Sequence, residues 1–193
     1  MFQQKTSKLT FVCGPMFAGK TSYVIHKIME NVIKKKNVLV ITSILDNRYT
    51  DSTSSIRSHD TLCLDLNNPC IKHIQTDKLI NTIDIILTSG IKNIFIDEVQ
   101  FFPDIIDFCK RLESIPDVNV IMSGLDTDFK KEDFNGIEKI YKYCDKVKKM
   151  HATCNICKTN IAIYSKRLSS SDKLIDIGGD DKYISVCKLC YSL

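Results

Sequence analysis

Two groups of residues near opposite ends of this chain have the types and the spacing that chemistry requires. Residues 14–21 read Gly-Pro-Met-Phe-Ala-Gly-Lys-Thr, and residues 154–157 and 187–190 each read Cys-x-x-Cys. A glycine-rich loop that ends in Lys-Thr is typical of a phosphate site, and two such cysteine pairs are typical of a metal site. The sequence therefore predicts phosphate chemistry in a chain that also carries a metal-stapled segment.

The phosphate loop needs a strand before it and a helix after it. Residues 9–13 are apolar and β-prone, and residues 20–34 repeat apolar side chains at helical spacing, so both elements are predicted. Glycines in the loop let backbone N–H groups and the helix N-terminus converge on phosphate oxygens. Lys20 would neutralise the β- and γ-phosphates, and the Thr21 hydroxyl would bind Mg²⁺. A chance match to the motif is the alternative. The predicted nucleotide-binding residues are Gly14, Pro15, Met16, Phe17, Ala18, Gly19, Lys20 and Thr21.

A second predicted strand is the short apolar run 93–98, which ends in Asp97 and Glu98. The carboxyl end of a buried parallel strand faces a bound nucleotide, so Asp97 is expected in the magnesium shell. Successive strand side chains point to opposite sides, so Glu98 can face a second substrate as a general base. The alternative is an acid pair that only ends a strand.

The four C-terminal cysteines, Cys154, Cys157, Cys187 and Cys190, predict tetrahedral Zn²⁺. Two disulfides are the alternative. The sequence shows no secretory signal, so we expect a reducing compartment, the cytoplasm, and favour zinc. The other cysteines follow no ligand spacing and are expected to be small buried thiols, namely Cys13, Cys63, Cys70, Cys109 and Cys144.

Composition predicts an ordinary globular protein. The chain has 193 residues, 44% of them hydrophobic, and a net charge of +4. It can bury one core and a small satellite, and no apolar run is long enough to cross a membrane. Lysine runs at 34–36 and 146–149 are more typical of a solvated face than of a nucleic-acid site.

The predicted fold class is α/β, with a phosphate-loop parallel sheet and a small zinc-ribbon domain at the C-terminus. Further strands are predicted at 38–42 and 118–124, and helices at 79–87 and 105–112. Such alternation implies helices on both faces of a parallel sheet. The polar segment 43–60 is expected to be a loop. We place the nucleotide-binding domain at 1–150 and the zinc domain at 151–193.

Taken together, the motifs resemble those of the cytosolic-type (type II) thymidine kinases, and the resemblance covers residues 9–191. Beyond the phosphate loop and cysteine pairs it rests on Asp-Asn-Arg-Tyr at 46–49, Ser-His-Asp at 58–60, the segments 97–104 and 124–129, and Gly-Gly-Asp-Asp-Lys-Tyr at 178–183. The resemblance implies an enzyme that transfers the γ-phosphate of ATP to the 5′-hydroxyl of deoxythymidine, with Glu98 as base. It also implies that Asp46 and Arg48 lie near the phosphates.

The resemblance assigns a nucleoside pocket as well. Met16, Phe101, Phe129 and Phe134 would wall it. The sequence alone favours core packing for any single phenylalanine, so only the resemblance places these residues in a pocket. A lasso closing over the base would include Leu174, Ile175, Asp176, Ile177, Gly178 and Tyr183, and zinc would anchor its two ends.

Some positions depart from the family pattern. Asp128, Asp133 and Asp176 are extra acids near the pocket and lasso, and Ser165 replaces a threonine. From charge alone, we expect deoxyuridine or an analogue to compete well with thymidine.

Other classes remain open. A nucleotide switch or motor ATPase uses the same loop, but the Asn-Lys-x-Asp segment of guanine-nucleotide switches is absent from the sequence. A nucleic-acid-binding zinc ribbon is the other class, although acids offset the lysines around its cysteines. By resemblance, we expect a homotetramer and feedback inhibition by dTTP.

Overall fold

The structure is a computed structural model, which describes residues 7–46, 55–58, 62–134, 136–168 and 178–193. Its centre is a sheet of six parallel strands in the order β5–β2–β6–β7–β1–β8. The strands are β1 (Lys8–Cys13), β2 (Val38–Ser43), β5 (Ile71–Thr76), β6 (Asn93–Ile96), β7 (Asn119–Gly124) and β8 (Lys146–Lys149). A parallel α/β sheet is thus confirmed.

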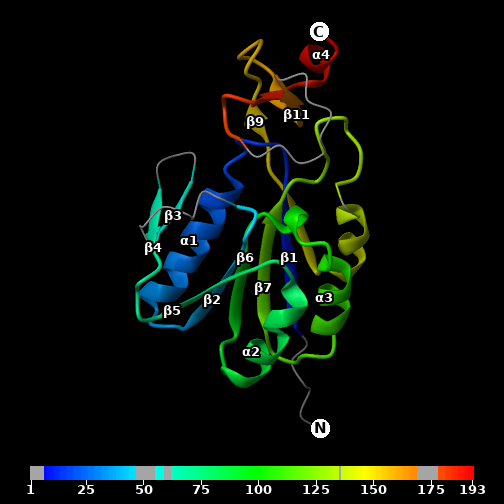
Figure 1. Cartoon of the computed structure of the whole chain (residues 1–193). Helices are drawn as coiled ribbons and strands as arrows, with labels where there is room; N and C mark the ends of the chain where they lie inside the picture. Colours follow the sequence, from blue (N-terminus) through cyan, green and yellow to red (C-terminus); the bar gives the residue numbers. More distant parts are fainter. Residues whose placement is uncertain (1–6, 47–54, 59–61, 135, 169–177) are drawn as a thin grey trace.

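Helices cover both faces of this sheet (Figure 1). Alternate residues of one strand face opposite sides, so Val12 packs with helix α1 (Lys20–Ile33) while Phe11 packs with α3 (Ile105–Leu112). The α3 side also carries η2 (Leu79–Thr82), α2 (Ile83–Thr88) and η4 (Ile137–Tyr143). Every residue of β2 is buried, as expected for a strand covered on both faces.

The C-terminal segment forms small antiparallel sheets of its own at one end of the molecule (Figure 1). They pair β9 (Ala152–Thr153) with β10 (Ile161–Ala162), and β11 (Tyr164–Arg167) with β12 (Tyr183–Val186), and α4 (Lys188–Tyr191) follows. We call residues 152–168 and 178–191 the zinc unit. The domain division at residue 150 stays a prediction.

Several elements differ from the expected ones. The helix predicted at 79–87 begins as the 3₁₀ turn η2, where the Asp104 carboxylate accepts the N–H groups of Leu79 and Ile80 at 3.1 and 2.8 Å. The expected loop 43–60 contains β3 (Ser55–Arg57), which pairs with β4 (Cys63–Asp65). Cys63 is exposed because only the middle residue of β4 faces inward, so a buried thiol was the wrong prediction there.

No helix among the described residues combines the length and the apolar character needed to cross a membrane.

Candidate functional site

The phosphate loop joins β1 to α1, and its first glycine is required by a close approach. Gly14 has a φ of +144°, and a Cβ there would overlap the carbonyl oxygen of Met150. Gly19 has a φ of +76° at the N-cap of α1. Left-handed torsions at these two positions turn the chain sharply between strand and helix. The loop therefore ends at a helix N-terminus, where N–H groups lack intrahelical partners.

Lys20 is the first residue of α1, and its side chain is buried. Its Nζ donates to the carbonyl oxygen of Pro15 at 2.7 Å, so the ammonium lies over its own loop. A cation held there complements an anion in the same loop.

Asp97 is positioned by two hydroxyl groups. It directly follows β6 and is 4% exposed. Thr21 Oγ1 donates to Asp97 Oδ2 at 3.0 Å, and Ser123 Oγ donates to Asp97 Oδ1. The phosphate loop and the ends of β6 and β7 therefore converge on one buried carboxylate. A hydroxyl beside a carboxylate offers the hard oxygen ligands that Mg²⁺ prefers.

Glu98 has an unusual backbone. Its φ of +53° places it in the left-handed region at the N-cap of η3 (Val99–Phe101). Its Oε2 accepts a hydrogen bond from Gln100 Nε2 at 2.6 Å. Since β6 ends at Ile96, strand alternation was the wrong reason to expect Asp97 and Glu98 to point apart. The sharp turn after Asp97 separates them instead, with Asp97 bonded to Thr21 and Ser123 and Glu98 bonded to Gln100.

The predicted nucleoside residues fall into two groups. Phe129 and Phe101 are partly buried, whereas Phe134 is buried in the main core. The Arg167 guanidinium lies 3.7 Å from the Phe129 ring centroid, and its Nε donates to Tyr183 Oη at 3.0 Å. The loop after β7 and the zinc unit therefore meet through stacked side chains.

A second contact joins the zinc unit to the phosphate loop. The backbone N–H of Met16 donates to Ser165 Oγ at 3.0 Å, and Ser165 is buried. Ser165 was noted in the sequence only as a departure from the threonine of the family. The serine hydroxyl still accepts the loop N–H.

Two of the extra acids bond to backbone groups. Asp128 Oδ1 accepts the N–H groups of Lys130 and Glu132 at 2.7 and 2.9 Å, and Asp133 Oδ1 accepts the N–H of Glu138 at 2.8 Å. Short acidic side chains commonly stabilise turns and helix starts in this way. Both carboxylates thus stabilise nearby backbone, and the charge pattern of the sequence did not reveal this role.

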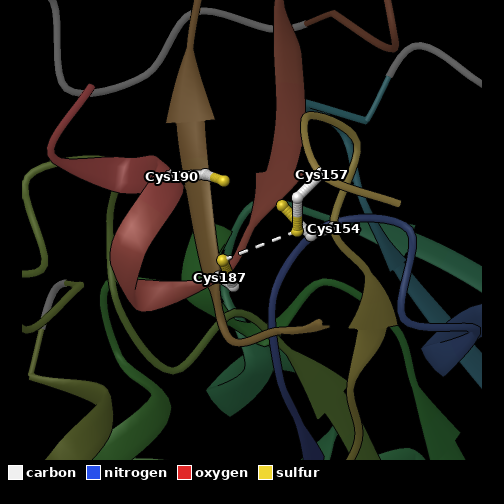
Figure 2. A group of neighbouring side chains, drawn as sticks. All are labelled: Cys154, Cys157, Cys187 and Cys190. Atoms are coloured by element: carbon white, nitrogen blue, oxygen red, sulfur yellow. Dashed lines mark hydrogen bonds between the residues drawn. The ribbon is translucent and has the colours of Figure 1, made fainter. Parts of the chain in front are cut away.

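The four paired cysteines converge (Figure 2). All four Sγ atoms lie within 4.8 Å of one another, and Cys157 Sγ and Cys187 Sγ are 4.0 Å apart. Tetrahedral zinc with Zn–S bonds of about 2.3 Å requires S···S distances of about 3.8 Å. The cluster fits that ion, and it joins the turn after β9 to α4.

Hydrogen bonding already favours a thiolate in this cluster. The Thr159 side chain, followed by the backbone N–H groups of Thr159 and Asn160, lowers the pKa of Cys157 to about 5. Burial, followed by hydrogen bonds among the neighbouring thiols, raises the pKa of Cys190 to about 12. Because zinc binds the thiolate, the ion would itself supply the charge that keeps Cys190 deprotonated.

Some predicted residues lie outside the described part of the chain. They are Arg48 and the lasso residues Leu174, Ile175, Asp176 and Ile177. Asp46 is described, is buried, and its N–H donates to the carbonyl oxygen of Ser43 just after β2. Gly178 is the first described residue after residues 169–177, and the chain continues from it into β12.

Comparison with known proteins decides the family. A family model described as "Thymidine kinase" matches residues 7–191. The chain belongs to the thymidine kinase family. The thymidine kinase of Amsacta moorei entomopoxvirus is 35% identical over 95% of this chain and 97% of its own length. That of Fowlpox virus is 33% identical over 93% and 94%, and that of Mycoplasma genitalium is 34% identical over 99% and 86%.

Family membership makes this thymidine kinase homologue a phosphotransferase. Its matched region includes both the phosphate loop and the cysteine cluster. Sequence reasoning assigned no role to three residues that hold the site in place, although one of them, Gln100, lies in the family segment 97–104. These are Ser123 beside Asp97, Gln100 beside Glu98, and Arg167 between Phe129 and Tyr183.

Proposed function

We propose that this chain transfers the γ-phosphate of ATP to the 5′-hydroxyl of deoxythymidine, giving dTMP for nucleotide salvage. One observation carries the proposal. Thr21 of the phosphate loop bonds to buried Asp97, and Glu98 follows directly with its carboxylate on a different partner. A phosphate site and a separate carboxylate thus lie one residue apart, as transfer to a second substrate requires.

The Thr21 hydroxyl and Asp97 would hold Mg²⁺, with Asp97 fixed by Ser123. When bound, Mg²⁺ neutralises charge on the β- and γ-phosphate oxygens. Lys20 adds a second cation on the loop side. We assign Arg48 and Asp46 to the same region, where a guanidinium would stabilise the migrating phosphoryl group.

Glu98 acts as the general base. Its carboxylate takes the proton of the 5′-hydroxyl as O5′ bonds to the γ-phosphorus. The bond between that phosphorus and the β,γ-bridging oxygen breaks, and ADP leaves. Because a dissociative transfer needs little nucleophile activation, the base chiefly orients the hydroxyl and accepts its proton.

The nucleoside would lie between the loop after β7 and the zinc unit. Met16, Phe101 and Phe129 supply apolar contact for a flat base, with Phe134 supporting them from the core. The lasso residues from Leu174 to Gly178 and Tyr183 would close over the base. Zinc would act from a distance, because it fixes both ends of the lasso.

Deoxyuridine is proposed as a second substrate. The charge argument for a broad base preference now rests on Asp176, since Asp128 and Asp133 bond to backbone N–H groups. We further propose a cytoplasmic homotetramer, feedback inhibition by dTTP and no nucleic-acid partner.

The test is transfer of label from [γ-³²P]ATP to deoxythymidine with Mg²⁺. We expect Glu98→Gln to lower kcat by roughly a hundredfold or more. Glu113→Gln, an exposed acid just after α3, is the matched control and should keep the wild-type rate. Hydrolysis of ATP without a labelled nucleoside would instead favour a nucleotide switch.

A further inference from the structure

Gln100 lies between Glu98 and the end of β7, and it contacts both. Its Nε2 donates to Glu98 Oε2 at 2.6 Å, and its Oε1 accepts the backbone N–H of Leu125 at 3.0 Å. Only 2% of Gln100 is exposed. A polar side chain buried this deeply is expected to have such partners.

The Leu125 contact fixes which way the amide points. A backbone N–H can only donate, so the Gln100 atom that faces it must be the oxygen. The NH₂ group therefore faces Glu98. Sequence spacing alone could not have shown this orientation.

The fold also leaves room for this side chain. A Cβ on Gly124 would lie 2.6 Å from Gln100 Oε1 and 2.8 Å from Val99 Cγ2, closer than real Cβ contacts come. Gly124 is not among the glycines with positive φ, so space and not torsion requires glycine there. Glycine at the last position of β7 thus leaves the space that the Gln100 amide occupies.

Glu98 needs such support because its backbone is strained. A φ of +53° in a residue other than glycine persists only where surrounding contacts hold it. The η3 turn supplies one such contact, since Phe101 N–H donates to the Glu98 carbonyl oxygen at 3.0 Å. Gln100, within the same turn, holds the side chain.

We propose that Gln100 is the positioning residue for Glu98, fixing the carboxylate toward the acceptor hydroxyl and favouring its ionised form. This inference rests on the proposed function, in which Glu98 is the base. Gln100 does not touch the reacting atoms. It acts by donating one hydrogen bond from an amide that Leu125 has already oriented.

The consequence is a specific pH dependence. A donor to a carboxylate stabilises the charged form, so removing that donor moves the loss of activity at low pH to higher pH. Gln100→Glu keeps the shape and still accepts the Leu125 N–H, but it places a second acid against Glu98. Two carboxylates in contact cannot both ionise easily, so one holds a proton up to higher pH.

The experiment is kcat/KM for deoxythymidine from pH 5 to 9 in wild type, Gln100→Glu and Gln100→Met. We expect the acid limb to move up by about one pH unit or more in Gln100→Glu. At pH 6 kcat/KM should fall about tenfold to a hundredfold, with partial recovery at pH 9 and little change in KM for ATP. Gln100→Met tests loss of the donor without a new acid.

A double variant separates positioning from simple structural support. In a Glu98→Gln background, Gln100→Met should lower the residual rate no further, because Gln100 acts through Glu98. Independent losses that multiply would overturn the proposal, as would a wild-type acid limb in a folded Gln100→Glu enzyme. Thermal unfolding of each variant establishes that it is folded.

The two proposals fail in different ways. Wild-type kcat in Glu98→Gln would overturn the base assignment, and Gln100 positioning with it. An inactive Glu98→Gln beside unchanged pH profiles in both Gln100 variants would overturn only the role of Gln100.

Discussion

The Tyr191 hydroxyl donates to the carbonyl oxygen of Phe129 at 2.6 Å. Tyr191 directly follows Cys190 of the four-cysteine cluster, and Phe129 lies in the loop after β7. Lys131 of the same loop reinforces the contact, with its Nζ 3.7 Å from the Tyr191 ring centroid and 4.7 Å from that of Tyr164. The zinc unit therefore holds the loop that carries two of the proposed pocket residues.

Removing this hydroxyl tests the connection. We expect Tyr191→Phe to raise KM for deoxythymidine by roughly three- to tenfold, the range of one ordinary hydrogen bond, with KM for ATP unchanged. Tyr143→Phe, on η4, is the matched loss of a hydroxyl outside the zinc unit and should leave both constants unchanged. Steady-state kinetics with each substrate varied in turn gives both KM values. Equal changes in the two would count against a role of the Tyr191 hydroxyl that is limited to the nucleoside pocket.

Bound zinc should be required for the hydrogen bond from Tyr191 to the Phe129 carbonyl oxygen. Cys187→Ser removes one ligand of the four, so we expect it to release zinc to a chelator at much lower chelator concentration than wild type does. Loss of zinc should also raise KM for deoxythymidine, because α4 and Tyr191 lose their anchor. Zinc release can be followed with a colorimetric chelator. Cys63→Ser, at an exposed thiol, is the control, and zinc release unchanged by Cys187→Ser would exclude that thiol as a ligand.

The sequence predicts the parallel core well because buried strands are strongly apolar. β7 was found within a residue of both its ends, whereas β6 begins as predicted at Asn93 but ends at Ile96, before the two carboxylates. The edge strands β5 and β8 were missed. Each pairs with only one neighbouring strand, and its lysines and other polar side chains give no continuous apolar run in the sequence. Pairing with β2 and β1 makes them strands, and that contact is not local in sequence.

The candidate site also has parts that the sequence predicts and parts that it does not. The phosphate loop, the acid pair and the cysteines have fixed spacing, so their chemistry is readable from the sequence. Contacts such as Met16 to Ser165 and Gln100 to Leu125 join residues far apart in the chain. Charge alone also does not reveal that Asp128 accepts hydrogen bonds from two backbone N–H groups.

The Thr21–Asp97 contact predicts a magnesium defect. Thr21→Ala should lower kcat/KM by roughly tenfold to a hundredfold and raise the Mg²⁺ concentration needed for half-maximal rate. Thr21→Ser keeps the hydroxyl and is expected to stay within about threefold of wild type. Initial rates across a Mg²⁺ titration make the measurement. If both variants respond to Mg²⁺ as wild type does, Thr21 is not a magnesium ligand.

Gly14 should matter more for stability than another left-handed glycine. Gly90 has a φ of +69° with nothing within 4 Å of an added Cβ, so Gly90→Ala should cost about 1–2 kcal/mol from torsion alone. Gly14→Ala adds overlap with the Met150 carbonyl, so its loss should be at least about twice as large. Urea unfolding of the two variants compares them directly. Equal losses would mean that the segment around Met150 shifts without cost.

His73 predicts a pH dependence of folding. It lies on β5, its Nε2 is 2.9 Å from Thr42 Oγ1, and burial lowers its pKa from the usual 6.5. Above pH 6.5 the imidazole is neutral in both the folded and unfolded states. As the pH falls from 6.5 toward the lower folded pKa, the unfolded chain gains the proton first, so stability is lost.

His73→Gln removes this titration and keeps a polar partner for Thr42. Carboxylates contribute to acid denaturation in both proteins, so the quantity to measure is the free energy of unfolding of wild type minus that of the variant. We expect this difference to be constant from pH 7 to 8 and to become less favourable to wild type between pH 6.5 and 5. Urea titrations at each pH supply the values, and a difference that does not change with pH would show that His73 titrates alike in both states.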